Sequence, residues 1–524
     1  MPASQARVPT DRAGRYLTQL CEHISRLTAL GHGHDEGGAA SMPRRAEWSD
    51  TDGIIDFGWG RCTLHTTGDA LVLHAEAEAQ PQLRRIEDSI SARLEQIGRR
   101  GGLTVTWRPA PSDAAGIIDA LLAPEGRADP FPLYAQAHTI GPVSAITGNS
   151  FLACGYAAVN QVLRDSGFGM ADSARPRPED PDQLVDHSLP SMSRSILRAN
   201  PPDHGRMRSL MTQVFTPRRV AALQPAIENA VDHLLDHLAE TGADGRPIDF
   251  MDRFAFPLPV TVICELLGVA PADRHRFRPL AADLTEILEL SAAASGLGPA
   301  DAAARELAAY FAHLVGERRA APDDDLVSAL VAARDADDGR LSDEELLANL
   351  ILLLVAGFET TTNLLGNGLA IVLDRPGLHT ALRAGRIPIS GFIEEVLRYD
   401  SPVQVTTRRA RADDLAIGDI SIPRGSEVIL LVGAANRDPD RYHDPDRFDP
   451  TRTDVKPLSF GAGPHICIGN SLARLEATVA FSRLVARFPA LTAAADQQPT
   501  RRDRLVLRGY QTLPVQVTSG QAGC

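Results

Sequence analysis

The residues around Cys467 restrict the fold of this chain more than any other part of its sequence. In SFGAGPHICIGNSLARLEA, residues 459–477, the cysteine lies among glycines and is followed at once by a helical pattern. A thiolate that binds a metal accepts hydrogen bonds from backbone N–H groups, and Gly461, Gly463 and Gly469 let the backbone come close enough to donate them. A helix N-terminus also favours negative charge. The segment therefore predicts a buried thiolate in a loop before a helix.

Four positions of this segment carry a resemblance to a known family. Phe460, Gly463, Cys467 and Gly469 stand in the order F-x-x-G-x-x-x-C-x-G, which resembles the signature of the cytochrome P450 family at every defining position. The resemblance implies that Cys467 is the axial ligand of the iron of haem b, iron protoporphyrin IX. It also implies that Phe460, Gly461 and Gly469 contact this cofactor.

A second motif follows the longest apolar run of the chain. The run ends in the sequence AGFETT, and Ser342 is a suitable N-cap for a long helix over this region. Ala356 and Thr360 are four residues apart and so share a helix face. The segment resembles the oxygen-activation helix of the cytochrome P450 family. This resemblance implies that Gly357 leaves room for dioxygen and a water, and that Glu359 and Thr360 relay protons.

Basic residues in three segments resemble the family's ligands of the haem propionates. PPDHGRMR supplies His204 and Arg208, which lie four residues apart and share one helical face. The cysteine loop supplies His465. TTRRARADD supplies a fourth donor: Arg408 keeps the family's R-x-A pattern, while the spacing to the following aspartate also allows Arg409.

A further pair of residues is expected to stabilise the fold rather than to take part in catalysis. Glu395 and Arg398 in EEVLR resemble the family's E-x-x-R pair. The resemblance implies that they form a buried network with Arg447 of DPDRF. Alone, this spacing would indicate only a surface ion pair that contributes little to stability.

The pattern of apolar residues changes along the chain. From about Ile117, Ala- and Leu-rich helical patterns alternate with Pro-rich loops, and two strand-like segments lie between residues 415 and 432. Residues 117–524 are therefore expected to form a mainly α cytochrome P450 fold with a minor β-sheet. The segment 111–116 is expected to be a linker, so that the chain is multidomain.

Residues 1–110 are expected to form a small α+β domain of order αβββαβ. The pattern predicts a helix over 12–30, three strands between 54 and 77, a helix from 81 to 98 and a last strand over 103–107. RYLTQLCEH and IIDFGWGRCTL resemble a small bacterial domain family of unknown function, which adds a boundary but no activity.

One open question in this domain is whether it holds a metal. Its possible ligands are Cys21, His23, Cys62, His65 and His74. Their spacing fits no standard zinc pattern, so a plain α+β core is the favoured interpretation. The segment HGHDEGG at 32–38 is expected to be a loop rather than a ligand set.

Charge and cysteine usage limit the partners and the compartment. A formal net charge of -14 disfavours nucleic acid and anionic membranes as main partners. The six cysteines are scattered without close pairing, which is typical of a reducing cytoplasm. The apolar run at 346–358 is expected to be too short to span a bilayer.

Taken with the resemblance, these features predict a cytoplasmic haem-thiolate monooxygenase of secondary metabolism. It is expected to hydroxylate or epoxidise a medium-sized apolar molecule, with O2 and with electrons from NAD(P)H through ferredoxin and ferredoxin reductase. One alternative is oxidative coupling or ring formation without net oxygen insertion. An alternative of another class is a haem-based binding or sensing protein. The N-terminal domain is a candidate for docking a carrier-bound substrate or the electron donor.

Overall fold

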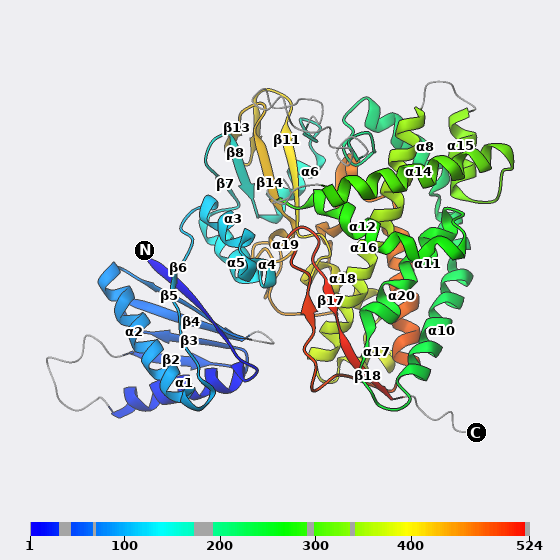
Figure 1. The fold of residues 1–524 in the computed structure, drawn as a ribbon. Helices are drawn as coiled ribbons and strands as arrows, with labels where there is room; N and C mark the ends of the chain where they lie inside the picture. The colour runs from blue at the N-terminus through cyan, green and yellow to red at the C-terminus, as the bar shows by residue number, and fades with distance from the viewer. Residues whose placement is uncertain are drawn as a thin grey trace. The chain divides into compact units, whose positions relative to one another are not determined.

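A computed structural model describes residues 2–30, 43–66, 70–171, 192–290, 298–335 and 341–518 (Figure 1). The chain divides into two compact units, Met1–Ser112 and Asp113–Cys524. Each unit is described by itself below. The predicted loop at 32–38 lies outside the described residues.

The N-terminal unit is an antiparallel sheet with two helices. Its strands pair in the order β2-β3-β4-β5-β1-β6, and every described pair is antiparallel. The elements in chain order are β1 (Ala3–Pro9), α1 (Ala13–Leu30), β2 (Arg45–Trp48), β3 (Asp52–Asp56), β4 (Gly60–Thr66), β5 (Ala70–Ala77), α2 (Gln80–Ile97) and β6 (Arg108–Pro109).

The core of this unit lies between the helices and one face of the sheet. Apolar residues of α1 and α2 recur at helical spacing and are buried. Along β1 and β5, buried residues alternate with more exposed ones, as expected for a sheet with one covered face. The two predicted helices and the three-stranded meander are confirmed.

The predicted order αβββαβ is incomplete, because the observed order is βαββββαβ. Strands β1 and β2 were missed, since ASQARVP and RAEW contain few of the bulky apolar residues that mark a strand. The last strand is Arg108–Pro109 rather than 103–107. Residues 103–107 instead run beside α2, where Val105 N–H donates to Glu95 and Trp107 Nε1 donates to Ser91.

The possible metal ligands of this unit do not converge. Cys21 and Cys62 are fully buried in the apolar core. The ring of His65 is exposed and pairs with Asp52 at 2.7 Å. Within the described residues, no three His, Cys, Asp or Glu side chains are placed to hold a metal ion. These observations favour the plain α+β core.

The C-terminal unit is mainly α-helical, as predicted. Its longer helices surround the central helix α16 (Figure 1). The helices are α3 (Ala114–Leu122), α4 (Pro124–Ala128), α5 (Phe131–Ile140), α6 (Tyr156–Arg164), α8 (Asp203–Val214), α9 (Pro217–Ala222), α10 (Gln224–Thr241), α11 (Pro257–Leu266), α12 (Phe277–Thr285), α14 (Gly298–Ala320), α15 (Leu326–Asp335), α16 (Asp343–Asp374), α17 (Leu378–Arg383), α18 (Ile389–Tyr399), α19 (Val432–Ala435) and α20 (Asn470–Arg487).

Small sheets complete this unit. The largest has five strands in the order β7-β8-β14-β11-β9. Its strands are β7 (Val143–Ala145), β8 (Ser150–Ala153), β9 (Phe168–Gly169), β11 (Val405–Ala410) and β14 (Glu427–Leu431). The other strands are β10 (Ile248–Asp249), β12 (Leu415–Ile417), β13 (Ile420–Ile422), β15 (Ala490–Ala493), β16 (Thr500–Arg501), β17 (Tyr510–Thr512) and β18 (Pro514–Thr518). The strand segments predicted between 415 and 432 are therefore confirmed.

The predicted linker 111–116 is too long at its C-terminal end. Helix α3 already begins at Ala114, and the side chain of Asp113 caps it by accepting a hydrogen bond from Gly116 N–H at 2.8 Å. The alanines of this segment were assigned to a flexible linker by composition, whereas their position after an Asp N-cap makes them the first turn of a helix.

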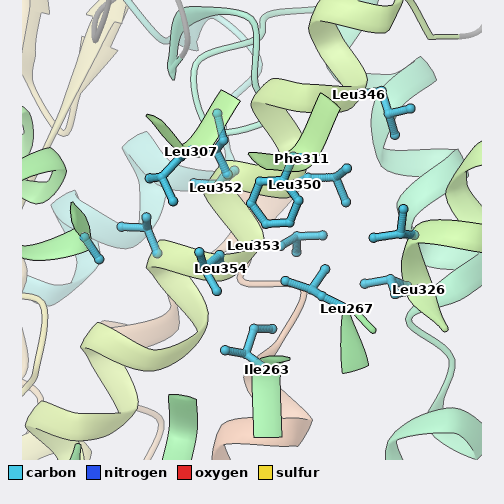
Figure 2. Packing of buried hydrophobic residues seen from close by; sticks show 14 of the residues in the cluster. Ile263, Leu267, Leu307, Phe311, Leu326, Leu346, Leu350, Leu352, Leu353 and Leu354 are labelled. Atoms are coloured by element: carbon cyan, nitrogen blue, oxygen red, sulfur yellow. The ribbon is translucent and has the colours of Figure 1, made fainter. Parts of the chain in front are cut away.

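Helix α16 forms the centre of the largest apolar cluster. It starts with a capping box in which Ser342 and Glu345 exchange hydrogen bonds, which confirms the predicted N-cap. Figure 2 shows Leu353 and Leu354 of α16 near Ile263 and Leu267 of the α11 region. The burial of this helix fixes the position of the AGFETT motif within it.

The apolar run is longer than expected. Helix α16 has 32 residues and is long and apolar enough to cross a membrane by length and composition alone. However, 72% of its most apolar window is buried inside the unit, as in a core helix. The estimate from residues 346–358 was too short because apolar residues continue beyond Phe358.

Candidate active site

Helix α16 is open on one short stretch of its surface. From Ala348 to Leu369 every residue is buried except Ala356, Gly357 and Thr360. These three positions share one side of the helix, because residues four apart lie one above the other. An accessible patch in the middle of a core helix indicates an internal space beside it. The structure thus brings together three of the residues that the sequence predicted to face the cofactor.

The hydroxyl of Thr360 lies on this open side. It donates a hydrogen bond to the carbonyl oxygen of Ala356 at 2.9 Å. Thr361 makes the equivalent bond to Gly357 at 3.2 Å. Back-bonding of this kind is common for threonine within helices. Because the hydroxyl oxygen of Thr360 can also accept hydrogen bonds, it remains able to hold a water molecule in the open space.

Glu359 points away from this space. Successive residues of an α-helix project about 100° apart, since 3.6 residues make one turn. The Glu359 side chain is 2% exposed, accepts a hydrogen bond from Arg502 and lies 3.9 Å from Arg504. The structure therefore does not bring Glu359 and the Thr360 hydroxyl into direct contact. Their relay stays a prediction, and it requires intervening water.

The two arginines were missed by the sequence analysis. Arg502 and Arg504 follow β16, far from AGFETT in the chain, and no local motif marks them. Arg504 also donates to Thr285 Oγ1 at 2.6 Å and to the Ala282 carbonyl at 2.7 Å. The C-terminal segment thereby connects α12 to the acidic residue of α16.

Gly357 lies between the open side of the helix and α11. A Cβ atom at this position would lie 2.9 Å from two side-chain carbons of Ile263 on α11. A larger residue would therefore displace the Ile263 side chain. Gly357 is itself partly accessible, and its role in leaving room for dioxygen and a water stays a prediction.

The backbone around Cys467 folds back on itself. A short 3-10 turn, Leu458–Phe460, precedes Gly461, whose φ of +69° strongly favours glycine. The Cys467 N–H donates to the carbonyl oxygen of Phe460 at 2.9 Å. Gly463 also has a positive φ, and a Cβ there would collide with the backbone at Leu163. Two of the three glycines are thus required by the shape of the loop.

The third glycine, Gly469, influences the pKa of the cysteine. Burial raises the pKa of the Cys467 thiol, whereas the backbone N–H of Gly469 and the positive charges of Arg208 and Arg474 lower it. Cys467 is only partly buried. The loop therefore offers a partly accessible cysteine near a backbone donor and two positive charges, as thiolate ligation of a metal requires.

The predicted propionate ligands form a cationic cluster. The rings of His204 and His465 lie 4.0 Å apart. Burial lowers the pKa of His465 to about 3, with the charges of His204, Arg408 and Arg208 acting in the same direction. Burial, followed by Arg208 and Arg408, likewise lowers the pKa of His204. The charge of Arg408 therefore lies within electrostatic reach of both histidines.

No carboxylate pairs with this cluster in the part of the chain that the structure describes. His204 Nε2 is buried without a hydrogen-bond partner among the described residues. Arg408 is 7% exposed, and its hydrogen bonds to described residues go to Thr406 Oγ1 and the Thr407 carbonyl. A buried polar group without a partner is costly, so an acidic ligand is expected here. The two carboxylates of haem b fit this requirement, and the Cys467 loop fits its iron.

The second arginine of this segment, Arg409, differs from Arg408. Neighbouring residues of a strand point to opposite faces of the sheet. No charge effect of Arg409 on either histidine is found, whereas Arg408 affects both. Of the two alternatives left open by the sequence, this electrostatic effect favours Arg408, and the choice stays a prediction.

The E-x-x-R pair is buried as expected, but its third member is different. Arg398 donates two hydrogen bonds of 2.8 Å to Glu395, and both side chains are fully buried. The arginine that joins Glu395 is Arg452, at 3.3 Å. Arg447 contributes only its carbonyl oxygen, which accepts from Arg398 at 3.1 Å. The network contacts the segment before the cysteine loop through Asn436, which bonds Ser459.

Comparison with known proteins agrees with this geometry. A profile of the family described as Cytochrome P450 matches residues 299–385 and 389–517. The 6-deoxyerythronolide B hydroxylase of Saccharopolyspora erythraea is 38% identical over 402 residues, which are 74% of this chain and 96% of that protein. The chain belongs to the cytochrome P450 family. Its cofactor is therefore haem b, and it is a monooxygenase of the soluble bacterial type by relationship.

Solved structures of cytochromes P450 share the fold of the C-terminal unit. P450BioI, determined in complex with hexadec-9Z-enoic acid ligated acyl carrier protein, has 34% sequence identity and a TM-score of 0.68 over 75% of this chain and 99% of its own. CxnD, described as a P450 for C-S bond formation in chuangxinmycin biosynthesis, has 34% identity and a TM-score of 0.66 over 75% of this chain and 95% of its own.

The N-terminal unit belongs to no part of the P450 pattern. A profile described as "Uncharacterized protein conserved in bacteria (DUF2218)" matches residues 5–108. This agrees with the resemblance to a small bacterial domain of unknown function. The match ends four residues before Ser112, the last residue of the N-terminal unit.

Proposed function

We propose that the chain hydroxylates or epoxidises a medium-sized apolar molecule with Cys467 as the axial ligand of the haem iron. The observation that carries this proposal is the accessible patch of Ala356, Gly357 and Thr360 in an otherwise buried helix. Ile263 packs against Gly357, so apolar side chains border the patch. The likeness to the 6-deoxyerythronolide B hydroxylase of Saccharopolyspora erythraea supports hydroxylation as the reaction.

Each polar residue of the site has a separate task in this proposal. The bound haem supplies the activation of dioxygen, to which a thiolate ligand donates electron density. Gly469 N–H, Arg208 and Arg474 stabilise the Cys467 thiolate. His204, Arg208, Arg408 and His465 hold the propionates. Thr360 holds a water and passes a proton from it, while Glu359 supplies protons to that water from the far side of α16.

Ligand screening followed by turnover tests this proposal. Purified protein is titrated with apolar compounds while the haem absorbance band is monitored, and compounds that shift it are incubated with NAD(P)H, ferredoxin and ferredoxin reductase. The expected product is heavier than its substrate by one oxygen atom, and the oxygen derives from 18O2. Binding without any product, with the redox partners shown to be active, would instead support a binding or sensing role.

Oxidative coupling is the second candidate. It is favoured by the likeness to CxnD, whose described reaction is C-S bond formation. The same test separates the two, because coupling removes two hydrogens from the substrate and adds no 18O.

Carrier-bound substrates and redox partners belong to the same proposal. The likeness to P450BioI, determined with an acylated carrier protein, supports a substrate that arrives on a carrier. The N-terminal unit then docks the carrier or the electron donor. A cytoplasmic location agrees with the free thiols of Cys21, Cys62, Cys154, Cys264 and Cys467.

A further inference from the structure

Two arginines lie within electrostatic reach of one another beside the histidine pair, Arg408 buried and Arg198 partly buried. Burial and, less strongly, the positive charge of Arg198 lower the pKa of Arg408 to about 10. Burial also lowers the pKa of Arg198. Among the described residues, no carboxylate lies within ion-pair distance of either guanidinium, and the side chain of Arg198 makes no hydrogen bond. Two like charges without anions are unfavourable at such a position.

The backbone holds Arg198 firmly in this place. On its N-terminal side, Ile196 N–H donates to Asn349 Oδ1 of α16 at 2.9 Å. On its C-terminal side, the Asn200 amide accepts from Met170 N–H at 2.8 Å and donates to the Met170 carbonyl at 3.1 Å. The backbone around Arg198 is therefore held by hydrogen bonds on both sides of this residue.

The second anchor brings this segment to the strand that carries Arg408. Met170 directly follows β9, and β9 pairs with β11 through Gly169 and Arg409. A Cβ atom on Gly169 would collide with the Asn200 side chain, so only glycine permits the approach. Asn200, Gly169 and the strand pairing thus bring the segment that carries Arg198 close to the strand that carries Arg408.

The charges of the arginines near His204 and His465 indicate which ligand binds beside them. Arg208, which also belongs to this cluster, donates to the Ile466 carbonyl at 2.6 Å and lies within the electrostatic reach of Cys467. Glu427 acts on Arg198 only at longer range. Arg198 and Arg408 have no carboxylate partner among the described residues, and haem b carries two carboxylates. Guanidinium groups are well suited to bidentate contact with carboxylates.

We propose that Arg198 is a further propionate ligand of the haem, which acts together with Arg208 and Arg408 on the two carboxylates, to which His204 and His465 also donate hydrogen bonds. The inference rests on haem binding at the proposed site. It assigns a role to a residue that lies outside the PPDHGRMR motif.

The rate of haem loss tests this role. The holoenzyme variants Arg198→Gln and Arg198→Lys are mixed with excess apomyoglobin, and haem transfer is followed by absorbance. Arg198→Gln should lose haem about tenfold faster and should have a more negative reduction potential, because a positive charge near the ferric haem is removed. Arg198→Lys should keep most of the potential. Arg194→Gln is the matched control, since Arg194 lies in the same segment but forms an exposed ion pair with Glu344.

The cofactor can be varied as well. After reconstitution with the dimethyl ester of iron protoporphyrin IX, wild type and Arg198→Gln should lose the cofactor at equal rates, because the carboxylates are blocked. Unchanged haem loss and potential in Arg198→Gln would overturn the inference, and a weakened affinity for carboxylate-bearing ligands alone would assign Arg198 to the substrate instead. Failure of the wild-type protein to bind haem at all would refute the proposed function itself.

Discussion

The buried carboxylate of Glu359 on α16 accepts a hydrogen bond from Arg502, a residue 143 positions later in the chain. Arg502 is 14% exposed and Glu359 is 2% exposed, so the pair is largely removed from water. Such a pair contributes little net stability by itself, but the loss of one partner leaves the other charge buried and unmatched.

Replacing Arg502 with Ala should therefore destabilise the C-terminal unit strongly. The expected loss is about 3 kcal/mol in the free energy of unfolding, at the lower end for a broken buried pair because Arg504 remains 3.9 Å from Glu359. Chemical denaturation measures it. The double variant Arg502→Ala, Glu359→Gln should recover most of the loss, since no buried charge remains. Equal instability of the single and double variants would mean that Arg502 acts through packing alone.

The Glu359–Arg502 pair also shows which contacts could not be predicted from the sequence. The cysteine loop and AGFETT are local motifs, so their residues could be named in advance, and the structure brings Ala356 and Thr360 onto one open side of the helix. Arg502 and Arg198 could not be named, because the groups that they act on, Glu359 and Arg408, come from segments far away in the chain. The sequence likewise named Arg447 where the fold uses Arg452, since both precede the cysteine loop within one irregular segment.

The prediction of strands in the N-terminal unit failed for a different reason. Strand β1 was missed because two of its three buried positions, Ser4 and Ala6, are small, and a strand pattern is recognised by bulky residues. It is nevertheless central to the sheet, where it pairs with both β5 and β6.

Glu476 on α20 should make stability depend on pH. Burial raises the pKa of Glu476 well above its usual value, and its Oε2 has no hydrogen-bond partner among the described residues. The native state then keeps a proton that the unfolded chain releases above about pH 4.5. Stability is therefore fully present below that pH and falls as pH rises towards the native pKa.

Glu476→Gln should remove this dependence. Relative to wild type, the variant should gain about 1.4 kcal/mol for each pH unit above 5 until the native pKa is reached. Urea unfolding at pH 5, 6, 7 and 8 measures the gain. Glu394→Gln on α18 serves as control, because Glu394 is half-buried and paired with Arg474, and no such trend is expected. A constant difference at all four pH values would show that Glu476 is ionised in the folded protein.

The Cys467→Ser variant should lose the absorbance band of the reduced CO complex that marks thiolate-ligated haem. A neutral hydroxyl cannot donate the same electron density to iron. Spectra of the reduced protein with CO measure the band, and Cys264→Ala, which changes a buried thiol of the apolar core, should retain it. If the serine variant keeps the band, Cys467 is not the axial ligand.

Removal of the N-terminal unit should leave a folded haem protein. A chain that begins at Asp113 keeps the N-cap of α3, whereas the sequence-based boundary at 117 would remove its first turn. The truncated protein should show the same haem spectrum and an unfolding midpoint close to that of the full chain. Loss of turnover with normal haem content would support docking by the N-terminal unit, and failure to fold would refute the division at this point.

Thr360 should control how efficiently electrons are used. Its hydroxyl lies on the open side of α16 and already bonds the Ala356 carbonyl at 2.9 Å, so it can orient a water in the adjoining space. Thr360→Ala should preserve folding and ligand binding, because the residue is only partly buried. Without the hydroxyl, protons are delivered less reliably, so NAD(P)H consumption should continue while product falls and hydrogen peroxide rises. The expected change in product per NAD(P)H is about tenfold, which corresponds to roughly 1.4 kcal/mol between competing barriers.

Two further variants separate the hydroxyl from the rest of the side chain. Thr360→Val keeps the shape but lacks the donor, so it should behave like Thr360→Ala, whereas Thr360→Ser keeps the donor and should retain most of the coupling. Thr361→Val is the matched control, since Thr361 makes the same type of bond, to Gly357 at 3.2 Å, but is buried away from the open side. Product and peroxide are quantified together for all four. If coupling is unchanged in both the Ala and Val variants at position 360, protons reach the oxygen by a path that does not use this hydroxyl.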